Sequence, residues 1–365
     1  MSNNRIQNVL LITPSINMGG MQSAMATLAN GLAECGVSVD MYAIFRLEHF
    51  YVLNPMVRFA EAPHAPNEYN LISRIASIVR NIRKAAIDSK AETVVVYGKF
   101  YSSLALLATL GLKKRVFISD RASPLYRDFW YVEMLTRLIY IFIKPAGVIA
   151  QTYISAAYQR KRFGRKVRIE VIPNAIRPIK RYECSRRNVV LAVGRFGDPL
   201  KGFDRLIEAW GLVDAPDWIL KFAGGSEAEE PSFGRRAREL GISERVEFLG
   251  KVTDLDELYA SSAIFVIPSR SEGFPNALAE AMMAGMCCVA FDFIAGPRDM
   301  IVSGENGIII PEGNVQMLAD SLQMLIATPA MRKKMGDGAL ETSRRFERSV
   351  VCNSILNFIS ATENH

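Results

Sequence analysis

Histidine and cysteine are scarce in this chain of 365 residues. Its three histidines are His49, His64 and His365, and none of them lies inside a motif, which argues against a histidine-based catalytic triad or zinc site. The five cysteines show neither metal-ligand spacing nor a disulfide pattern, so we expect free thiols in a reducing, cytosolic compartment. Two of them, Cys287 and Cys288, lie in an apolar run and are expected to be buried.

Long hydrophobic runs and the common nucleotide motifs are also missing. No apolar stretch approaches the roughly 20 residues that cross a bilayer, and residues 3–11 lead into a strand rather than a secretory leader. The absence of a P-loop argues against an NTPase, and the absence of G-x-G-x-x-G argues against a nicotinamide dehydrogenase. With 50% hydrophobic residues, the chain is typical of a globular α/β protein long enough for two domains.

Charge is divided unevenly along the chain. Residues 1–180 hold 24 Lys+Arg against 11 Asp+Glu, whereas residues 181–365 hold 20 against 26. A basic half joined to an acidic half predicts an anionic partner, and membrane headgroups, a phosphorylated substrate or nucleic acid each satisfy that. The basic residues are dispersed and no recognition motif accompanies them, so nucleic acid is the least favoured of the three.

Strands and helices alternate through both halves. The first half opens with a strand at 8–13, a glycine turn and a helix at 21–35, and the second restarts with a strand at 189–193. This alternation predicts an α/β fold of two doubly wound, Rossmann-like parallel sheets. We expect a basic N-terminal domain over 1–180 and a second domain over 181–349. The remaining segment, 350–365, contains a helix that could pack on either domain, and the N-terminal domain is the suggested partner.

Two segments combine apolar and basic residues at helical spacing. The helix expected at 70–88 has a basic outer face, and the segment 131–143 is strongly apolar with a few cations. Each is consistent with packing on a sheet or with contact to lipid, and packing in the core is the favoured interpretation for both.

Polar motifs follow the strands of the first half. Gly19-Gly20 comes after the first strand, and Asp120-Arg121 comes after a strand expected at 115–118. The carboxyl ends of parallel strands are where open α/β sheets bind ligands. The glycine pair either lets a ligand phosphate approach the backbone or simply forms a tight turn.

Basic and glycine-rich turns recur in the second half. Gly194-Arg195 ends its first strand, and Lys201 lies just before a helix. Two cations beside a glycine turn and a helix N-terminus suit a diphosphate, although either residue alone is as typical of a protein surface. Gly224-Gly225 ends the next strand and permits close approach of a ring or phosphate to the backbone.

The stretch 269–284 organises this half. Glu272 lies in the loop after an apolar strand, and Glu280 lies about one turn into a helix that begins near Asn276. An acid so placed can accept hydrogen bonds from two ribose hydroxyls, although both glutamates are equally consistent with solvated charge. Asp254 and Asp256 have the spacing of a metal-binding pair, but they open a helix, where aspartate is expected as a cap.

Taken together, these motifs resemble those of glycosyltransferase family 4, the retaining, nucleotide-sugar-dependent group with the GT-B architecture of two domains facing across a cleft. The resemblance covers nearly the whole chain, and the two glutamates eight positions apart with the upstream cations are its most specific part. The matching positions are Gly19-Gly20, Asp120-Arg121, Asn174, Gly194-Arg195, Lys201, Gly224-Gly225, Glu272, Phe274, Pro275, Asn276, Ala277 and Glu280.

The resemblance implies a role for each position. Glu280 would hold the donor ribose, while Arg195 and Lys201 would bind the diphosphate with Gly20 of the other domain. Glu272 would contact the donor sugar, and residues 274–277 would fix its hydroxyls. Gly19, Asn174, Gly194, Gly224 and Gly225 would complete the donor site. The catalytic candidates are Glu272, Asp120 and Arg121; many relatives carry a histidine in place of this acid–arginine pair.

A subgroup that builds bacterial polysaccharides and lipid-linked oligosaccharides shares this acid–arginine variant. The implied activity is a hexosyl- or N-acetylhexosaminyltransferase using a nucleotide-sugar, expected to be a UDP-sugar, and a membrane-associated lipid-diphosphate or polysaccharide acceptor. No metal or other cofactor is expected, and the implied location is the cytoplasmic face of the inner membrane, bound through the basic domain. The alternative is a non-catalytic nucleotide-sugar or glycan-binding protein on the same fold.

Overall fold

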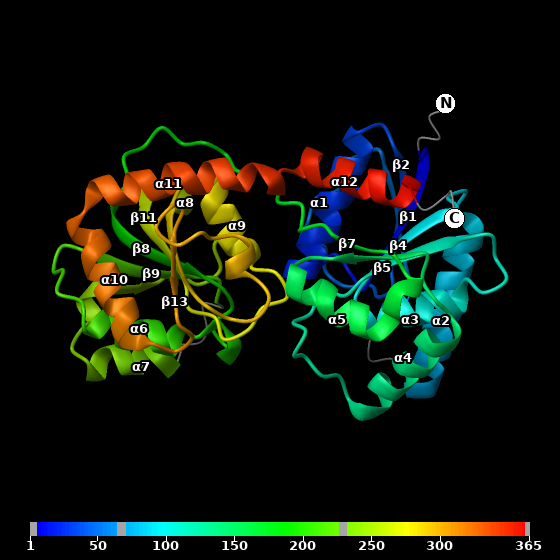
Figure 1. Ribbon diagram of the computed structural model, residues 1–365, viewed down its shortest axis with the longest axis horizontal. Helices are drawn as coiled ribbons and strands as arrows, with labels where there is room; N and C mark the ends of the chain where they lie inside the picture. The colour runs from blue at the N-terminus through cyan, green and yellow to red at the C-terminus, as the bar shows by residue number, and fades with distance from the viewer. Residues whose placement is uncertain (1–5, 64–70, 226–231, 362–365) are drawn as a thin grey trace. The chain divides into compact units, whose positions relative to one another are not determined.

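The chain forms two α/β units in the computed structural model, which describes residues 6–63, 71–225 and 232–361 (Figure 1). Unit 1 comprises residues 1–176 with 346–365, and unit 2 comprises residues 177–345. The sequence places these boundaries at 180 and 349, and the structure places both a few residues earlier. His64, His365 and the first residue of the helix expected at 70–88 lie outside the described residues.

Unit 1 contains a seven-stranded parallel sheet in the order β3-β2-β1-β4-β5-β6-β7. The order reverses between β1 and β4, which is the switch point of a doubly wound fold. Both central strands are apolar and buried because helices cover both faces of the sheet. The strands are β1 (Asn8–Thr13), β2 (Ser38–Ala43), β3 (Val57–Glu61), β4 (Thr93–Tyr97), β5 (Arg115–Ser119), β6 (Gly147–Ala150) and β7 (Ile169–Val171).

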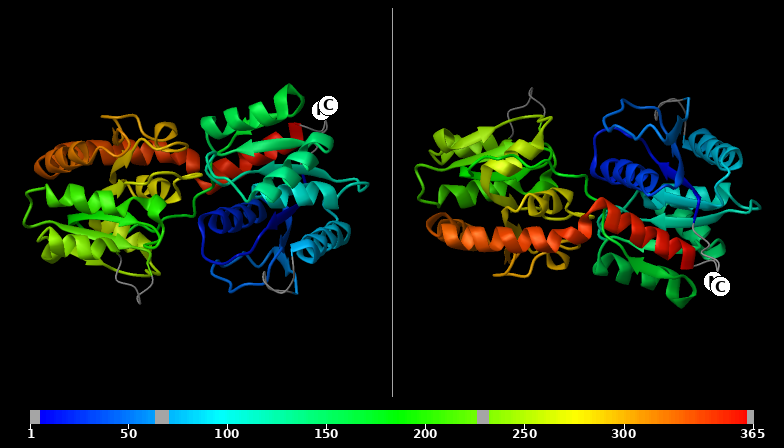
Figure 2. Two further views of the ribbon diagram at one scale, coloured as in Figure 1. Left: turned by 90° about the horizontal axis from the view of Figure 1, so that it is seen from below. Right: turned by 90° about the horizontal axis from the view of Figure 1, so that it is seen from above.

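Helices from both ends of the chain cover the sheet of unit 1. One face packs against α1 and α12, and the other against α2, α3 and α4 (Figure 2). The C-terminal helix α12 therefore belongs to unit 1, where Val351, Ile355 and Phe358 are buried beside α1. The helices are α1 (Gly20–Glu34), α2 (Leu71–Asp88), α3 (Lys99–Ala108), α4 (Trp130–Phe142), α5 (Tyr153–Phe163) and α12 (Arg348–Ala361).

Unit 2 repeats this design with a six-stranded parallel sheet in the order β10-β9-β8-β11-β12-β13. Its strands are β8 (Arg187–Val193), β9 (Ile219–Ala223), β10 (Val246–Phe248), β11 (Ser262–Ile267), β12 (Cys287–Phe291) and β13 (Ile308–Ile310). Its helices are α6 (Phe203–Gly211), α7 (Ser232–Glu239), α8 (Leu255–Ser261), α9 (Asn276–Met283), α10 (Val315–Ala327) and α11 (Pro329–Ser343). The two doubly wound sheets expected from the sequence are thereby confirmed.

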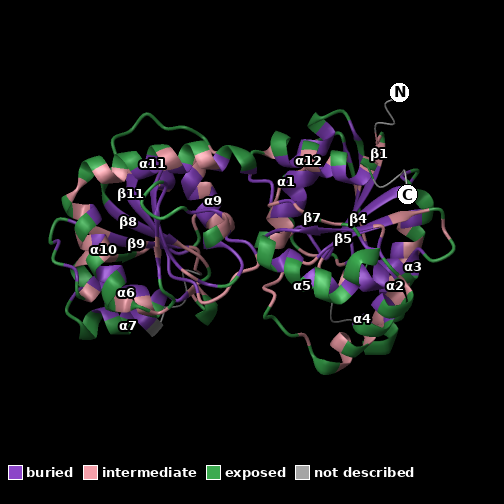
Figure 3. Cartoon of the chain, viewed as in Figure 1, coloured by how far each residue is buried: buried purple, intermediate pink, exposed green. Residues whose placement is uncertain are grey.

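Burial follows the layers, with buried strands between helices that expose their outer faces (Figure 3). Cys287 and Cys288 of β12 are buried free thiols, as the sequence predicts. The expectation that the segment 131–143 packs in the core holds for one side of the helix only. In α4, Thr136, Ile139 and Tyr140 are buried, and Ile139 and Tyr140 belong to the unit 1 core. The remaining apolar side chains of α4 include a row that is exposed along the outside of the helix.

Candidate functional site

Glu272 and Lys201 meet at the carboxyl edge of the unit 2 sheet. The Lys201 Nζ atom lies 2.7 Å from Oε1 of Glu272, and the Ser269 hydroxyl donates to the same oxygen at 2.8 Å. Both charged side chains are mostly buried, at 21% and 13% exposed. A largely desolvated cation beside a carboxylate can neutralise an anionic group while the acid accepts hydrogen bonds from hydroxyls.

Backbone contacts fix this pair in place. Gly202 adopts the left-handed conformation, with φ of +68°, between Lys201 and the start of α6. A Cβ at Gly202 would lie 2.0 Å from the carbonyl oxygen of Pro268, at the end of β11. Only glycine allows the turn before α6 to lie this close to the loop after β11. The Arg270 N–H also donates to the Leu200 carbonyl at 2.7 Å, so the two loops are directly hydrogen bonded.

Two other candidate glycines of unit 2, Gly224 and Gly225, have a packing explanation in the structure. Gly224 has φ of +114°, and a Cβ there would lie 2.7 Å from the Gly194 carbonyl oxygen. A Cβ on Gly225 would overlap the ring of Phe196. These glycines let the turns after β8 and β9 pack together, and the expected approach of a ligand to them stays a prediction.

Arg195 is not part of the Lys201–Glu272 pair. Its side chain is 73% exposed and bridges to Asp198 at 2.8 Å within its own turn. An arginine held only by an exposed bridge can turn toward a ligand at little cost, because such bridges contribute about 0–1 kcal/mol. Of the two cations expected to bind a diphosphate together, Lys201 is held beside Glu272 and Arg195 is exposed, and their joint role stays a prediction.

Glu280 lies inside unit 2 on α9. Its Oε2 accepts the Tyr259 hydroxyl at 2.9 Å, and its Oε1 lies 3.6 Å from Nε of Arg177. Tyr259 is fully buried, and Arg177 is itself held by Asp256 of α8. Burial raises the pKa of the Glu280 carboxyl, and the Arg177 charge and the Tyr259 hydrogen bond oppose that rise. The carboxylate is thus oriented by two neighbours, as a residue that recognises a diol requires.

The loop and first turn of α9 contain the remaining candidates of unit 2. Phe274 and Pro275 are buried, whereas Asn276 and Ala277 are half-buried. Pro275 occupies the N-cap and supplies no side-chain hydrogen bond, and no acidic residue occupies the first turn. The partial positive charge of this helix end therefore has no side-chain counterpart on α9 itself.

Gly19 and Gly20 lie at the start of α1 in unit 1. The Gly19 N–H donates to the Tyr51 hydroxyl at 3.2 Å, and that hydroxyl donates to the Gly19 carbonyl at 3.0 Å. Neither a side-chain cap nor an acid occupies the first turn of α1. Tyr51 thus fixes a glycine loop at a helix N-terminus, the geometry that suits an anionic group.

Arg121 and Asn174 form a buried polar cluster at the carboxyl edge of the unit 1 sheet. Arg121 stacks on the Tyr97 ring, with Cζ 3.7 Å from its centroid, and donates to the Asn174 side-chain oxygen. Gln151 donates to the same oxygen at 3.0 Å. Within the described ranges, Nε and Nη2 of Arg121 and Oε1 of Gln151 are buried without a hydrogen-bond partner. Unpaired buried polar atoms are rare in folded proteins, and a bound water, ion or ligand can satisfy them.

Asp120 lies beside this cluster in a cavity of about 370 Å³. Among the described residues its carboxylate has only long contacts, 3.3 Å to the Ala122 N–H and 3.9 Å to Arg162. Burial raises the pKa of the Asp120 carboxyl, and the Arg162 charge opposes that rise. Lys99 also lines the cavity and is paired with Asp128 at 3.2 Å.

Sequence reasoning missed several of these residues. Tyr97 and Gln151 stand at or just after the carboxyl ends of β4 and β6, and that position is the signal that could have identified them. Tyr259 and Arg177, which hold Glu280, had no such signal because they come from α8 and from the start of unit 2.

No cluster of three or more histidine, cysteine, aspartate or glutamate side chains in the described part of the chain could hold a metal. Asp254 caps α8 and accepts the Tyr182 hydroxyl at 2.7 Å. Asp256 accepts Arg177 and the Lys180 N–H. Both members of the metal-like pair therefore have structural roles. Among the described helices, none is both long and apolar enough to cross a membrane.

Comparison with known proteins gives a consistent result. Residues 179–342 match the family model described as glycosyl transferases group 1. The chain is 25% identical to an uncharacterized glycosyltransferase of Haemophilus influenzae, over 87% of this chain and 90% of that protein.

It is 24% identical, over 98% of this chain and 100% of that protein, to a Campylobacter jejuni protein. That protein is named GalNAc-alpha-(1->4)-GalNAc-alpha-(1->3)-diNAcBac-PP-undecaprenol alpha-1,4-N-acetyl-D-galactosaminyltransferase. Among solved structures, HepE of Anabaena in complex with UDP and glucose is similar with a TM-score of 0.77 and 17% identity, covering 97% of this chain and 100% of that one.

Proposed function

We propose that this chain, whose residues 179–342 match the family model of the glycosyl transferases of group 1, is a retaining, metal-independent transferase that extends a lipid-linked or polysaccharide glycan. The donor is a nucleotide-sugar with a hexosyl or N-acetylhexosaminyl group. The observation that carries this proposal is the Lys201–Glu272 pair, because it unites a cation suited to a diphosphate with an acid suited to sugar hydroxyls.

The donor would lie along the carboxyl edge of the unit 2 sheet. Glu280, oriented by Tyr259, accepts the two ribose hydroxyls. Lys201 and the exposed side chain of Arg195 neutralise the diphosphate, and Glu272 contacts the sugar. UDP is the favoured nucleotide, a choice supported by the fold shared with HepE, which was solved with UDP and glucose.

The chemistry is front-face substitution. The bond between the anomeric carbon and the diphosphate oxygen breaks, and the bond to the acceptor oxygen forms on the same face of the sugar. The acceptor proton passes to the departing diphosphate oxygen, so no side chain has to act as general base. Lys201 and Arg195 then stabilise the charge that develops on the leaving group. Asp120 and Arg121 of unit 1 are proposed to bind the acceptor sugar, since they line a cavity and have weakly satisfied polar atoms.

Donor turnover tests the proposal. Hydrolysis and transfer would be measured with UDP-, GDP- and ADP-sugars and a polyprenyl-diphosphate-linked acceptor, with and without EDTA. We expect one donor to be used, activity to survive EDTA, and Glu272→Ala to lower turnover by about 100-fold or more. Glu272→Gln separates charge from shape, and Glu239→Ala, on exposed surface of α7, is the control.

Two outcomes would contradict it. Tight nucleotide-sugar binding without turnover of any donor would favour the second candidate, a non-catalytic binding protein, for which the same site geometry suffices. Activity lost in EDTA and restored by a divalent metal would contradict metal independence while leaving the transferase assignment intact.

A further inference from the structure

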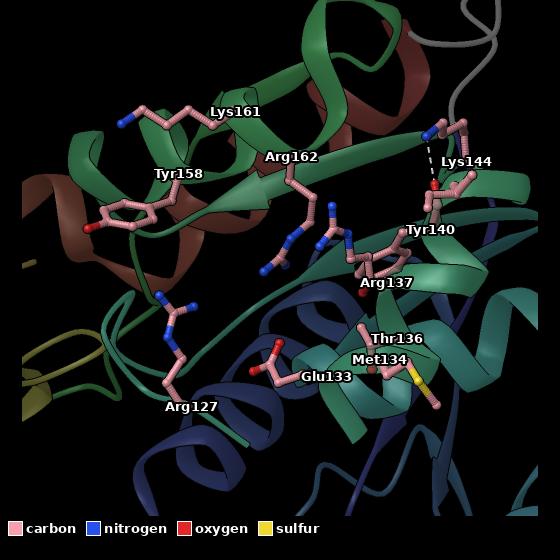
Figure 4. A pocket seen from close by; sticks show the side chains of 11 residues that line it. Arg127, Glu133, Met134, Thr136, Arg137, Tyr140, Lys144, Tyr158, Lys161 and Arg162 are labelled. Atoms are coloured by element: carbon pink, nitrogen blue, oxygen red, sulfur yellow. Dashed lines mark hydrogen bonds between the residues drawn. The ribbon is translucent and has the colours of Figure 1, made fainter. Parts of the chain in front are cut away.

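A second cavity of unit 1, of about 730 Å³, lies between α4 and α5 (Figure 4). Its lining is strongly basic. Figure 4 shows the side chains of Arg137 and Arg162 directed into the space between the two helices. The cations that line the cavity are Arg127, Arg137, Lys144, Lys161 and Arg162.

These cations have almost no counter-charge. The acid that lines the cavity, Glu133, is already paired with the buried Lys99. Arg162 has a carboxylate only at 3.9 Å, that of Asp120. In the described part of the chain, no carboxylate lies within 4.0 Å of the other four cations of the cavity. Lys144 donates to the Tyr140 carbonyl at 2.6 Å, which leaves its charge without a carboxylate partner (Figure 4). Several cations without a carboxylate partner around one concave space create a positive potential that favours a multiply charged anion.

The outer side of α4 adds an apolar surface next to the cavity. Trp130, Met134, Leu138 and Phe142 are spaced four residues apart and so form one stripe along the helix. They are 75%, 52%, 46% and 82% exposed, and the neighbouring Ile141 is 53% exposed. We call these five residues the α4 stripe. An exposed apolar stripe flanked by cations and containing tryptophan is typical of a helix that lies in a membrane interface.

We propose that the cavity between α4 and α5 binds the phosphate groups of an anionic lipid while the α4 stripe enters the lipid layer beside it. This conclusion depends on both the cations of the cavity and the α4 stripe. A nucleic acid or a soluble phosphate would use the cations but not the stripe, and an apolar protein partner would use the stripe but not five cations. A phosphate-bearing lipid uses both.

The position of the cavity connects it with the proposed acceptor. Arg127, Tyr158 and Arg162 line both this cavity and the one that contains Asp120 and Arg121. A diphosphate in the basic cavity would therefore leave the sugar attached to it next to Asp120. This step rests on the proposed function, and it names the lipid-diphosphate end of the acceptor as the group that unit 1 recognises.

Vesicle flotation of the full chain tests the inference without any turnover. Three vesicle types would be compared: phosphatidylcholine alone, phosphatidylcholine with phosphatidylglycerol, and phosphatidylcholine with a polyprenyl diphosphate. We expect weak binding to the first, salt-sensitive binding to the second and the tightest binding to the third. The pair Arg137→Glu and Lys144→Glu should weaken binding to both anionic vesicles by about 30-fold or more. The pair Trp130→Ser and Leu138→Ser should weaken it by at least about 10-fold.

Matched controls lie on α2 of the same unit. Arg80 and Lys84 are exposed cations there, and Ile72 and Ile87 are 81% and 60% exposed. Reversing those charges, or replacing those isoleucines by serine, should leave flotation within about 2-fold of the wild type.

The inference is overturned if the α2 and α4 variants lose binding equally, or if the wild type floats on no vesicle. Binding of inorganic diphosphate that the Arg137/Lys144 pair abolishes, without flotation, would identify a soluble phosphate ligand and also contradict the lipid assignment. Donor turnover by a chain that does not float would leave the proposed function standing. Flotation with the expected pattern but without turnover would leave this inference standing alone.

Discussion

Arg121 is held in an environment that costs stability. Two of its guanidinium nitrogens are buried without a hydrogen-bond partner among the described residues, and an unsatisfied buried group costs about 1–3 kcal/mol. Stacking on Tyr97 offsets part of that cost. Burial also lowers the pKa of the Arg121 guanidinium. The two unpaired nitrogens of Arg121 could donate to a bound anion or hydroxyl group, which is consistent with the role proposed above for Arg121 in acceptor binding.

Asp120 gives a prediction about pH. Because burial raises the pKa of this carboxyl above its ordinary value of 3.8, the folded chain retains a proton that the unfolded chain has released just above that pH. Between pH 3.8 and the raised pKa of the folded chain, the unfolding free energy of the wild type should therefore fall relative to that of Asp120→Asn as the pH rises. Above the raised pKa, the difference in unfolding free energy between the two proteins should be constant. Each unit of pKa elevation corresponds to about 1.4 kcal/mol.

Urea unfolding of both proteins from pH 4 to pH 8 measures this difference. Asp88→Asn, at an exposed position on α2, controls for removal of a carboxylate. If the unfolding free energy of the wild type instead rises relative to that of Asp120→Asn as the pH rises, the charge of Arg162 has a larger effect on the pKa of Asp120 than burial has.

The motif residues were more predictable than their partners. Glu272, Glu280 and Lys201 stand out in the sequence because they flank strand ends and helix starts. The residues that orient them do not: Tyr259 reaches Glu280 from α8, and its sequence context is that of an ordinary core tyrosine. A hydrogen bond between elements that are distant in the chain depends on packing, which local sequence patterns do not encode.

At the scale of elements, the central strands and their helices were predictable because they are continuous apolar runs or periodic segments. The sequence patterns did not indicate β3 because it is a short edge strand with polar residues. They did indicate β11 because it is a mainly apolar run that ends before a proline. The burial of α4 was predicted only in part because composition alone does not show which side of an apolar helix meets the core. Its exposed stripe is visible only in the folded unit.

Gly202 gives a prediction about the junction between β11 and α6. Gly202 and Gly241 both have φ of +68°, but a Cβ at Gly202 would clash with the Pro268 carbonyl, whereas one at Gly241 would have nothing within 4 Å. Gly241→Ala should therefore cost only the left-handed strain, about 1–2 kcal/mol. Gly202→Ala should cost that strain plus overpacking, about 2–5 kcal/mol in all, and should weaken nucleotide binding by displacing Lys201.

Urea unfolding and nucleotide titration of the two variants measure these effects. Equal costs at the two positions would show that the loops after β11 and before α6 separate without penalty. The closeness of Lys201 and Glu272 would then not depend on Gly202.

At the scale of the whole molecule, the chain leaves unit 1 once and returns to it. The first 176 residues build the sheet of unit 1, the next 169 build unit 2, and the final segment completes unit 1 with α12. The return is specific. A Cβ on Gly31 of α1 would lie 2.5 Å from Sγ of Cys352, so the two helices are in close contact. Arg348 also bridges to Glu34 at 2.7 Å, and Phe358 packs on Phe117 with ring centroids 5.6 Å apart.

This topology predicts that the end of the chain stabilises its beginning. Ile355 is 1% exposed in the unit 1 core, so Ile355→Asp would bury an unpaired carboxylate and should cost about 4 kcal/mol or more. Asn353→Asp, on the exposed side of the same helix, should change stability by less than about 0.5 kcal/mol. Hydrogen exchange should then show loss of protection in β1, β4 and α1, while β8 and β11 stay protected, because α12 packs in the core of unit 1 and those two strands belong to unit 2. Equal loss in both sheets would instead mean that the two units unfold as one cooperative body, and no loss in either would mean that α12 contributes nothing to the core in which it lies.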